Sequence, residues 1–306
     1  MSLPASEIKR TIETQPVFTL IVSGQPTVQP LVKQIGDELR AAGMGVSLRE
    51  LVPGVSIKLL AMHDHGAETA PIFSRIKEQV RTAGAAYALF PGLDDPPEFR
   101  LAVMDMDSTL INQEVIEELA EFAGVREHVA RVTTLAMEGK LDFHQALRER
   151  VKLLAGQPES ILDEVLNHRI TPTPGLTELL AGFRRMGIRT AVVSGGFSRI
   201  VQKFADRVGI DHALANELEI VDGKLTGEVL GEIVGADVKQ RTLLELAQRY
   251  RIEPRQAIAI GDGANDLKMM AVSGLGVAFC AKPIVQEQAL AAINRRRIDD
   301  TLLFLA

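Results

Sequence analysis

The alternation of apolar and polar positions divides the chain into two parts. In the first hundred residues, short apolar runs predict β-strands at 17–24, 45–52, 55–62 and 85–91. Between them, apolar residues recur at helical spacing from Val28 to Leu39 and again over 70–84, which predicts two helices. The resulting order, β-α-β-β-α-β, is typical of an antiparallel sheet that carries both helices on one face.

A second pattern begins after "GLDDPPEF" (92–99), whose paired prolines and charges mark a domain boundary. Beyond it, helices alternate with apolar strands, which are predicted at 99–107, 188–196, 256–263 and 274–281. The segment 212–230 holds two short strands around Asp222-Gly223, a hairpin turn signal. We therefore predict an N-terminal α+β domain over 1–95. Over 96–306 we predict an α/β domain with a Rossmann-like, doubly wound parallel sheet.

A long helical insert interrupts this alternation. Helical spacing continues from 112 to 170, between the first two strands of the predicted core. Such an insert is expected to lie as a cap over the carboxyl ends of the strands and to act as a lid. The next helix is predicted over 171–187, with Thr173 as its N-cap and Pro174 at its first position. The apolar residues of that helix share one face: Leu176, Leu179, Leu180, Phe183 and Met186.

Composition and charge exclude several classes of function. The chain has 306 residues, enough for two globular domains, and its formal net charge of -6 argues against a nucleic-acid partner. Its single cysteine, Cys280, fits a reducing compartment. The N-terminal stretch "MSLPASEIKRTIETQ" lacks the apolar core of a signal peptide, and no apolar run approaches the roughly 20 residues that span a bilayer. We expect a soluble, cytoplasmic protein without a membrane partner.

Acidic residues gather where the predicted core strands end. Asp105 and Asp107 follow the first apolar run in "LAVMDMDSTL", and Asp262 follows a later strand in "GDGAND". Because the carboxyl ends of parallel strands meet at one edge of the sheet, these three carboxylates are expected to converge. Burying them together without a counter-ion is costly, and carboxylate oxygens are the ligands that Mg²⁺ prefers. The sequence therefore predicts a Mg²⁺ site at this edge.

Groups suited to a phosphate follow the neighbouring strand. Ser194 offers a hydroxyl, and the amides of Gly195 and Gly196 are exposed donors at a strand end. Lys239 lies at a predicted helix start and adds a point charge for the same phosphate. A metal held by carboxylates, together with these donors, indicates a phosphoryl-transfer site.

The chemistry-bearing motifs resemble those of a known family. "DMDST" (105–109), "VVSGG" (192–196), Lys239 and "GDGAND" (261–266) are similar, in order and place, to the motifs of the haloacid dehalogenase-like phosphatases. Over 99–295 the chain most resembles the phosphoserine phosphatases of that family. This implies Mg²⁺-dependent hydrolysis of O-phospho-L-serine to L-serine and phosphate, the last step of serine biosynthesis. The first domain resembles ACT regulatory domains, which implies an amino-acid effector or a homodimer.

The resemblance also assigns roles to individual residues. Asp105 is implied to be the nucleophile, which forms an aspartyl-phosphate, and Asp107 the general acid and base, while Met106 stands between them where the family usually has phenylalanine. Asp266 is implied to orient Lys239 or a metal-bound water rather than to bind the metal.

Substrate recognition is implied to lie in the cap. Glu114 is assigned to the ammonium group of the substrate and Arg150 to its carboxylate, which a guanidinium holds through two parallel bonds. Phe143 would pack over the substrate, and Asn265 would contact phosphate or substrate. Spacing by itself leaves an alternative for each, namely solvent-exposed charged helix faces for Glu114 and Arg150 and an ordinary core position for Phe143.

Two other readings of the function stay open. The same chemistry would serve another small phosphomonoester, either by hydrolysis or by phosphoryl transfer to an alcohol. A different class of protein, an amino-acid-sensing module with a degenerate phosphatase half, is disfavoured because Asp105, Asp107, Lys239 and Asp262 are all present.

Overall fold

The computed structural model describes residues 16–24, 28–62, 70–92, 96–137 and 140–305. These residues form two compact units, the first made of the chain up to Glu98 together with 277–306, and the second of Phe99–Gly276. The predicted boundary segment therefore ends where the second unit begins, although its residues 93–95 lie outside the described chain, as do the first fifteen residues. No helix among the described residues is long and apolar enough to cross a membrane.

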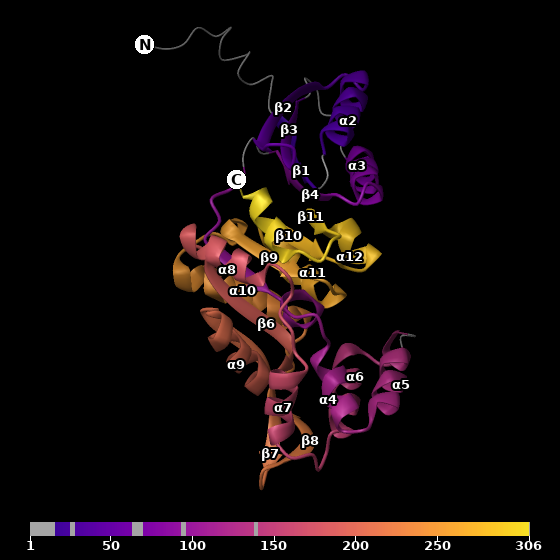
Figure 1. Cartoon of the computed structure of the whole chain (residues 1–306), viewed down its shortest axis with the longest axis vertical. Helices are drawn as coiled ribbons and strands as arrows, with labels where there is room; N and C mark the ends of the chain where they lie inside the picture. Colours follow the sequence, from indigo (N-terminus) through magenta and orange to yellow (C-terminus); the bar gives the residue numbers. More distant parts are fainter. Residues whose placement is uncertain (1–15, 25–27, 63–69, 93–95, 138–139, 306) are drawn as a thin grey trace. The chain divides into compact units, whose positions relative to one another are not determined.

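The first unit contains the predicted β-α-β-β-α-β order, which the structure confirms. The elements are β1 (Pro16–Ser23), α2 (Gln29–Ala41), β2 (Gly45–Val52), β3 (Ser56–Met62), α3 (Ala70–Thr82) and β4 (Ala86–Pro91). The strands lie in the order β2-β3-β1-β4, and every neighbouring pair is antiparallel. Helices α2 and α3 lie on the same side of the strands (Figure 1). The resemblance of this unit to ACT domains, its effector and a homodimer stay predictions.

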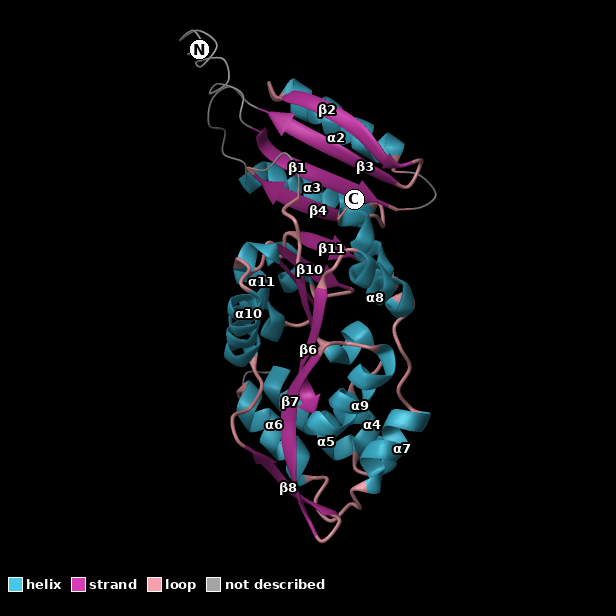
Figure 2. Ribbon diagram, turned by 90° about the vertical axis from the view of Figure 1, so that its left-hand side faces the viewer, coloured by secondary structure: helices cyan, strands magenta, loops and turns pink. Residues whose placement is uncertain are grey.

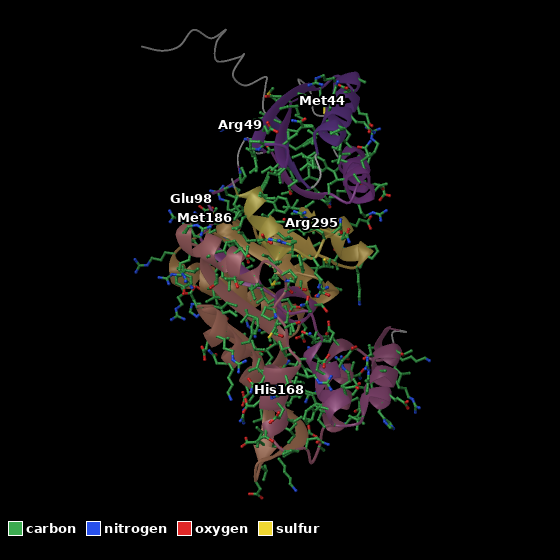
Figure 3. All side chains as sticks on the ribbon, viewed as in Figure 1. Met44, Arg49, Glu98, His168, Met186 and Arg295 are labelled. Atoms are coloured by element: carbon green, nitrogen blue, oxygen red, sulfur yellow. The ribbon has the colours of Figure 1, made fainter. Side chains whose placement is uncertain are left out.

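The end of the chain extends this first unit. Strand β11 (Ala291–Ile293) pairs with β4, and the last residues of β10 (Leu275–Phe279) pair with β11 in parallel. Helix α12 (Pro283–Gln288) and the turn Ile298–Phe304 follow β10 and β11 along the chain. Arg295, labelled in Figure 3, forms an ion pair with Asp300 of that turn. The sequence analysis had assigned 277–306 to the second domain, whereas these residues group with the first unit.

The second unit is an α/β fold built on a mixed sheet. Its strands are β5 (Leu101–Met104), β6 (Arg189–Phe197), β7 (His212–Val221), β8 (Lys224–Leu230) and β9 (Ala257–Gly261), in the order β9-β5-β6-β7-β8. The first four of that order run parallel, which confirms the predicted core, and β8 returns antiparallel through the predicted Asp222-Gly223 turn. Strand β5 lies between β6, the next strand of this unit along the chain, and β9, the last, so the strand order reverses beside β5. Such a reversal creates a crevice at the carboxyl ends of the strands.

Helices cover both faces of this sheet. Helices α10 (Ala236–Tyr250) and α11 (Leu267–Val272) lie on one side of β6, and α8 (Leu176–Arg185) and α9 (Ser198–Val208) lie on the other (Figure 2). The strands are buried on both faces, so they read as continuous apolar runs such as "AIAIG" in β9. The Rossmann-type fold that the sequence predicted is therefore present in this unit.

The insert between β5 and β6 is helical, as predicted. It comprises α4 (Val115–Phe122), α5 (Arg126–Met137), α6 (Phe143–Lys152) and α7 (Ser160–His168). The hairpin of β7 and β8 packs closely against this insert at Gly227 of β8. Gly227 has a φ of 91°, and a Cβ added there would lie 3.1 Å from the Cα of Lys152. Only glycine permits this approach of β8 to α6.

Two local predictions are wrong at the segment that returns from the insert. Helix α8 begins at Leu176, and Gly175, with φ of 87°, occupies the position before it, so Thr173 is not the N-cap and Pro174 is not in the helix. The amide of Thr173 instead donates to the carbonyl of Leu110, a tertiary contact that holds the segment extended. Met186 lies beyond the last turn of α8 and is 45% exposed rather than part of its apolar face (Figure 3).

Candidate active site

The first acidic residue ends the central strand and is held there by the backbone. Strand β5 stops at Met104, earlier than the predicted residue 107, because the chain turns over Met106–Leu110. The Asp105 amide donates to the Ile260 carbonyl at 2.9 Å, and its Oδ1 accepts from the Met106 amide at 2.8 Å. The side chain of Asp105 is buried, and no hydrogen bond from the described residues reaches its other oxygen, Oδ2. Contacts among the described residues thus fix Oδ1 and leave Oδ2 without a hydrogen bond.

A fully buried lysine lies beside this carboxylate. Lys239, in the first turns of α10, places its Nζ 2.7 Å from Asp105 Oδ1 and 2.7 Å from Asp266 Oδ1. Burial by itself would lower the pKa of Lys239, but the two carboxylates raise it, so the ammonium group stays charged. Asp266 also accepts from the Gly263 amide through Oδ2 at 3.0 Å. The contact between Asp266 and Lys239 agrees with the orienting role that the sequence analysis assigned, a role that stays a prediction.

The carboxylates outnumber the positive charge available to them. Burial raises the pKa of Asp262 to about 7, and the charges of Asp105 and Asp266 add to the rise. Burial and Asp105 likewise raise the pKa of Asp266 to about 6, against the opposing effect of Lys239. The raised pKa values of Asp262 and Asp266 follow from several buried carboxylates sharing one ammonium group.

These carboxylates fit a divalent cation. Oxygens of Asp105, Asp262 and Asp266 lie within 4.8 Å of one another, and their chemistry is that of a hard-cation site. A cation among them would favour their charged forms and return the raised pKa values toward their usual range. Asp107, which was also predicted as a ligand, is outside this group of oxygens among the described residues, so its part in metal binding stays a prediction.

Asp107 differs from Asp105 in its surroundings. Its Oδ1 is buried and has no hydrogen-bond partner among the described residues. Burial, followed by the charges of Glu114 and Asp105, raises the pKa of Asp107 well above its ordinary value. A raised pKa favours the protonated form of this carboxyl group, which suits a general acid.

The groups predicted to bind phosphate lie where β6 separates from β7. The register between these strands shifts between Val193 and Phe197, which removes "SGG" (194–196) from regular pairing. The Gly196 amide donates to Ser194 Oγ at 2.9 Å, so the hydroxyl hydrogen of Ser194 is free to point elsewhere. The Cβ of any other residue at Gly196 would lie 3.1 Å from Ser194 Oγ and 3.6 Å from Asp107 Oδ2.

Two residues that the sequence analysis did not predict support these groups. Asn216 of β7 is buried; its Nδ2 donates to the Gly195 carbonyl and its Oδ1 accepts from the Val234 amide, both at 2.8 Å. It thereby connects the 194–196 turn to the segment that leads into α10 and Lys239. Thr109 Oγ1 donates to Asp262 Oδ1 at 3.4 Å. Asparagine is disfavoured in strands, so its presence within the predicted strand region was the sequence signal that could have identified Asn216 as a structural or functional residue.

The predicted substrate residues of the insert face the same carboxylates. Burial raises the pKa of Glu114, and its Oε1 accepts from Ser108 Oγ at 2.7 Å. Burial lowers the pKa of Arg150 from its ordinary value, while the charges of Glu114 and Asp107 oppose that shift. Arg150 and Glu114 lie close enough to interact electrostatically, yet they form no ion pair within 4.0 Å in the part of the chain that the structure describes.

Phe143 and Asn265, the other two predicted substrate contacts, each pack against a glycine. The Phe143 ring, at the start of α6, rests on Gly195 and Gly235, where an added Cβ would lie 3.3 Å and 3.5 Å from ring carbons. This ring is 38% exposed, so it is not an ordinary core side chain. The Asn265 side chain folds back onto Gly263, and its contact to phosphate or substrate stays a prediction.

The fold and these residues agree with comparisons to known proteins. The model of the haloacid dehalogenase-like hydrolase family matches residues 102–271. A phosphoserine phosphatase of Streptomyces coelicolor is 39% identical over 284 residues, which cover 93% of this chain and 69% of that relative. A crystal structure of a haloacid dehalogenase family hydrolase from Salmonella enterica superposes with a TM-score of 0.81 and 30% identity, covering 94% and 98% of the two chains. A substrate-bound phosphoserine phosphatase structure superposes with a TM-score of 0.64 and 43% identity, and the match covers 68% of this chain and 99% of that structure's chain.

Proposed function

The chain belongs to the phosphoserine phosphatases of the haloacid dehalogenase-like hydrolase family, and from this premise we propose that it hydrolyses O-phospho-L-serine to L-serine and phosphate. The observation that carries the proposal is the buried Asp105 carboxylate, whose Oδ1 is fixed by Lys239 within a cluster of acidic oxygens. The proposed reaction requires Mg²⁺ and passes through an aspartyl-phosphate.

The first half-reaction transfers the phosphoryl group to the protein. Oδ2 of Asp105 attacks phosphorus in line, so that a phosphorus–oxygen bond forms on Asp105 as the bond to the serine oxygen breaks. Asp107 donates its proton to that leaving oxygen, a role supported by its raised pKa. Ser194, Gly195, Gly196 and Lys239 would bind the phosphate oxygens, for which the Gly196 amide would exchange its present acceptor, Ser194 Oγ, for the phosphate.

The second half-reaction returns the nucleophile. Asp107, now ionised, takes a proton from the water that attacks phosphorus, and the bond between phosphorus and Asp105 breaks to release phosphate. Asp105 and Asp262 would hold Mg²⁺, which when bound would neutralise phosphate charge and make phosphorus more electrophilic. Asp266, whose Oδ1 lies 2.7 Å from Lys239 Nζ, would keep that ammonium group directed at the phosphate oxygens.

Substrate choice is assigned to the two charged residues of the insert. Glu114 would bind the ammonium group and Arg150 the carboxylate, an assignment supported by their opposite charges and by the partial burial of both side chains. Phe143 would cover the bound substrate from α6. The insert is proposed to act as a lid, which would exclude water during phosphoryl transfer.

Phosphate release tests this function directly. We expect rapid release from O-phospho-L-serine with Mg²⁺ and its loss when the metal is removed by a chelator. Sugar phosphates and other phosphomonoesters without an amino-acid group should be hydrolysed far more slowly, because they lack partners for Glu114 and Arg150. Comparable turnover of sugar phosphates would reject the proposed substrate and favour a broader phosphomonoesterase.

Removing either charge of the insert should weaken binding more than chemistry. We expect Glu114→Gln and Arg150→Ala each to raise KM for O-phospho-L-serine by about 10- to 100-fold with a smaller change in kcat, because each leaves one substrate charge unpaired. Steady-state kinetics measure this.

Matched controls lie nearby on α4 and α6. Glu117→Gln in α4 and Arg148→Ala in α6 remove equal charges from exposed positions, and their KM should stay close to that of the unaltered enzyme. An equal effect of the control variants would mean that net charge, rather than direct contact, determines substrate binding.

A further inference from the structure

Ser108 adopts a backbone conformation that its residue type disfavours. Its φ is 55° and its ψ is 0°, which lies in the left-handed region, within the turn that follows the nucleophile. Serine there costs free energy that glycine would not. The turn closes through the Ser108 amide, which donates to the Gln113 carbonyl at 3.1 Å. The catalytic turn and the first residues of the insert are therefore joined at this point.

The side chain of Ser108 makes a contact that glycine could not make. Its Oγ donates to Glu114 Oε1 at 2.7 Å, in partly buried surroundings. Glu114 precedes α4 but does not cap it, because its side chain accepts no hydrogen bond from the helix amides. Among the described residues, the Ser108 hydroxyl is thus the hydrogen-bond donor that restrains this carboxylate, and it occupies Oε1 while Oε2 remains for another partner.

We propose that Ser108 is a positioning residue for substrate specificity: it fixes the Glu114 carboxylate for the ammonium group of the substrate. The inference rests on the proposed function and deepens it. A glutamate side chain has several rotatable bonds, and a carboxylate that is held before binding loses less entropy when the ammonium arrives. The left-handed backbone directs Ser108 Oγ at Glu114, so the strain of the turn serves recognition.

The contact pattern separates this role from one in phosphoryl transfer. Asp105 is held by Met106 and Lys239, and Ser108 donates its hydroxyl to Glu114 rather than to Asp105 or Asp107. Loss of the hydroxyl should therefore be felt by substrates that carry an ammonium group and not by those that lack one.

Two variants and two substrates test the proposal. Ser108→Gly removes the hydroxyl and suits the positive φ, and Ser108→Ala removes the hydroxyl but keeps the strain. The substrates are O-phospho-L-serine and 3-phosphooxypropanoate, which is the same molecule without its amino group. We expect KM for O-phospho-L-serine to rise by about 10- to 100-fold in both variants, with kcat within about twofold. The kinetics on 3-phosphooxypropanoate should be unchanged.

A double-mutant cycle shows whether Ser108 acts through Glu114. In a Glu114→Ala background, adding Ser108→Gly should change kcat/KM for O-phospho-L-serine by less than about twofold, because the partner is already absent. Full additivity of the two losses would overturn the proposal. An equal loss of kcat/KM on both substrates in Ser108→Gly would also overturn it, because Ser108 would then affect phosphoryl transfer rather than recognition of the ammonium group.

The outcomes also separate this inference from the proposed function. An unaltered enzyme that does not discriminate between the two substrates would reject the substrate assignment and the inference together. An unaltered enzyme that discriminates strongly, with Ser108→Gly discriminating equally well, would overturn the inference alone. Thermal unfolding of each variant shows whether a kinetic loss reflects the loss of folded protein.

Discussion

Asp105→Asn is expected to lower kcat for O-phospho-L-serine on the order of 10⁴-fold or more. The amide that replaces the carboxylate cannot form a stable bond to phosphorus, so the first half-reaction stops. Release of inorganic phosphate measures the rate, and acid-quenched protein shows whether any phosphoenzyme forms. The fold should persist, because Lys239 keeps its ion pair with Asp266 and asparagine preserves the shape of the side chain.

A matched change on the surface controls for loss of a carboxylate. Asp206→Asn alters an exposed residue of α9, and its kinetics should equal those of the unaltered enzyme. Near-normal turnover by Asp105→Asn would reject Asp105 as the nucleophile and leave it an electrostatic part of the site.

Lys239→Met is expected to damage both stability and catalysis. The ammonium group is fully buried between Asp105 and Asp266, and its removal leaves two buried carboxylates without their counter-charge. Breaking a buried pair in this way costs about 3–5 kcal/mol of the free energy of unfolding. Denaturant unfolding measures that loss, and phosphate release should fall sharply because a phosphate-binding charge and the orientation of Asp105 are both lost.

The stability deficit of Lys239→Met should depend on pH. Asp266 already has a folded-state pKa raised to about 6, and without Lys239 that pKa rises further. A carboxyl group whose pKa is higher in the folded state favours folding at low pH and opposes it once the pH passes its unfolded value of about 4. In the unaltered protein Asp266 also keeps its proton up to about pH 6, so between pH 4 and 6 the two proteins lose stability alike. The deficit should therefore grow as the pH rises above about 6 and be smaller and nearly constant below that pH.

A surface lysine provides the control for this pH dependence. Lys268→Met removes an exposed ion pair with Asp237, which should change the free energy of unfolding by less than about 1 kcal/mol at any of these pH values. A Lys239→Met deficit that did not change with pH would mean that the buried carboxylates are not its cause.

Local sequence was sufficient for the elements of the fold and for the main chemical groups. Apolar runs and helical spacing depend on nearest neighbours, so β9 was predicted close to its observed bounds and the insert was predicted to be helical. The placement of Asp105 and Asp262 beside each other followed from one rule, that parallel strands end at the same edge of a sheet.

The errors lie where a distant contact overrides a local preference. Thr173 has the residue type and setting of an N-cap, yet its amide bonds to Leu110 and α8 begins later, at Leu176. The last thirty residues continue the α/β pattern in sequence, but pairing of β11 with β4 groups them with the first unit. Neither outcome is contained in the local pattern.

By itself, the sequence determined which chemical groups the site has and the strand or helix that carries each of them. Only the tertiary structure decided which groups meet. Lys239 bridges Asp105 and Asp266, and the Ser108 hydroxyl donates to Glu114. Asn216 connects the 194–196 turn to the segment that leads into α10. The physical reason is range. Periodicity and turn chemistry act over a few residues, whereas hydrogen bonds and ion pairs join atoms a few ångströms apart in space whatever their separation along the chain.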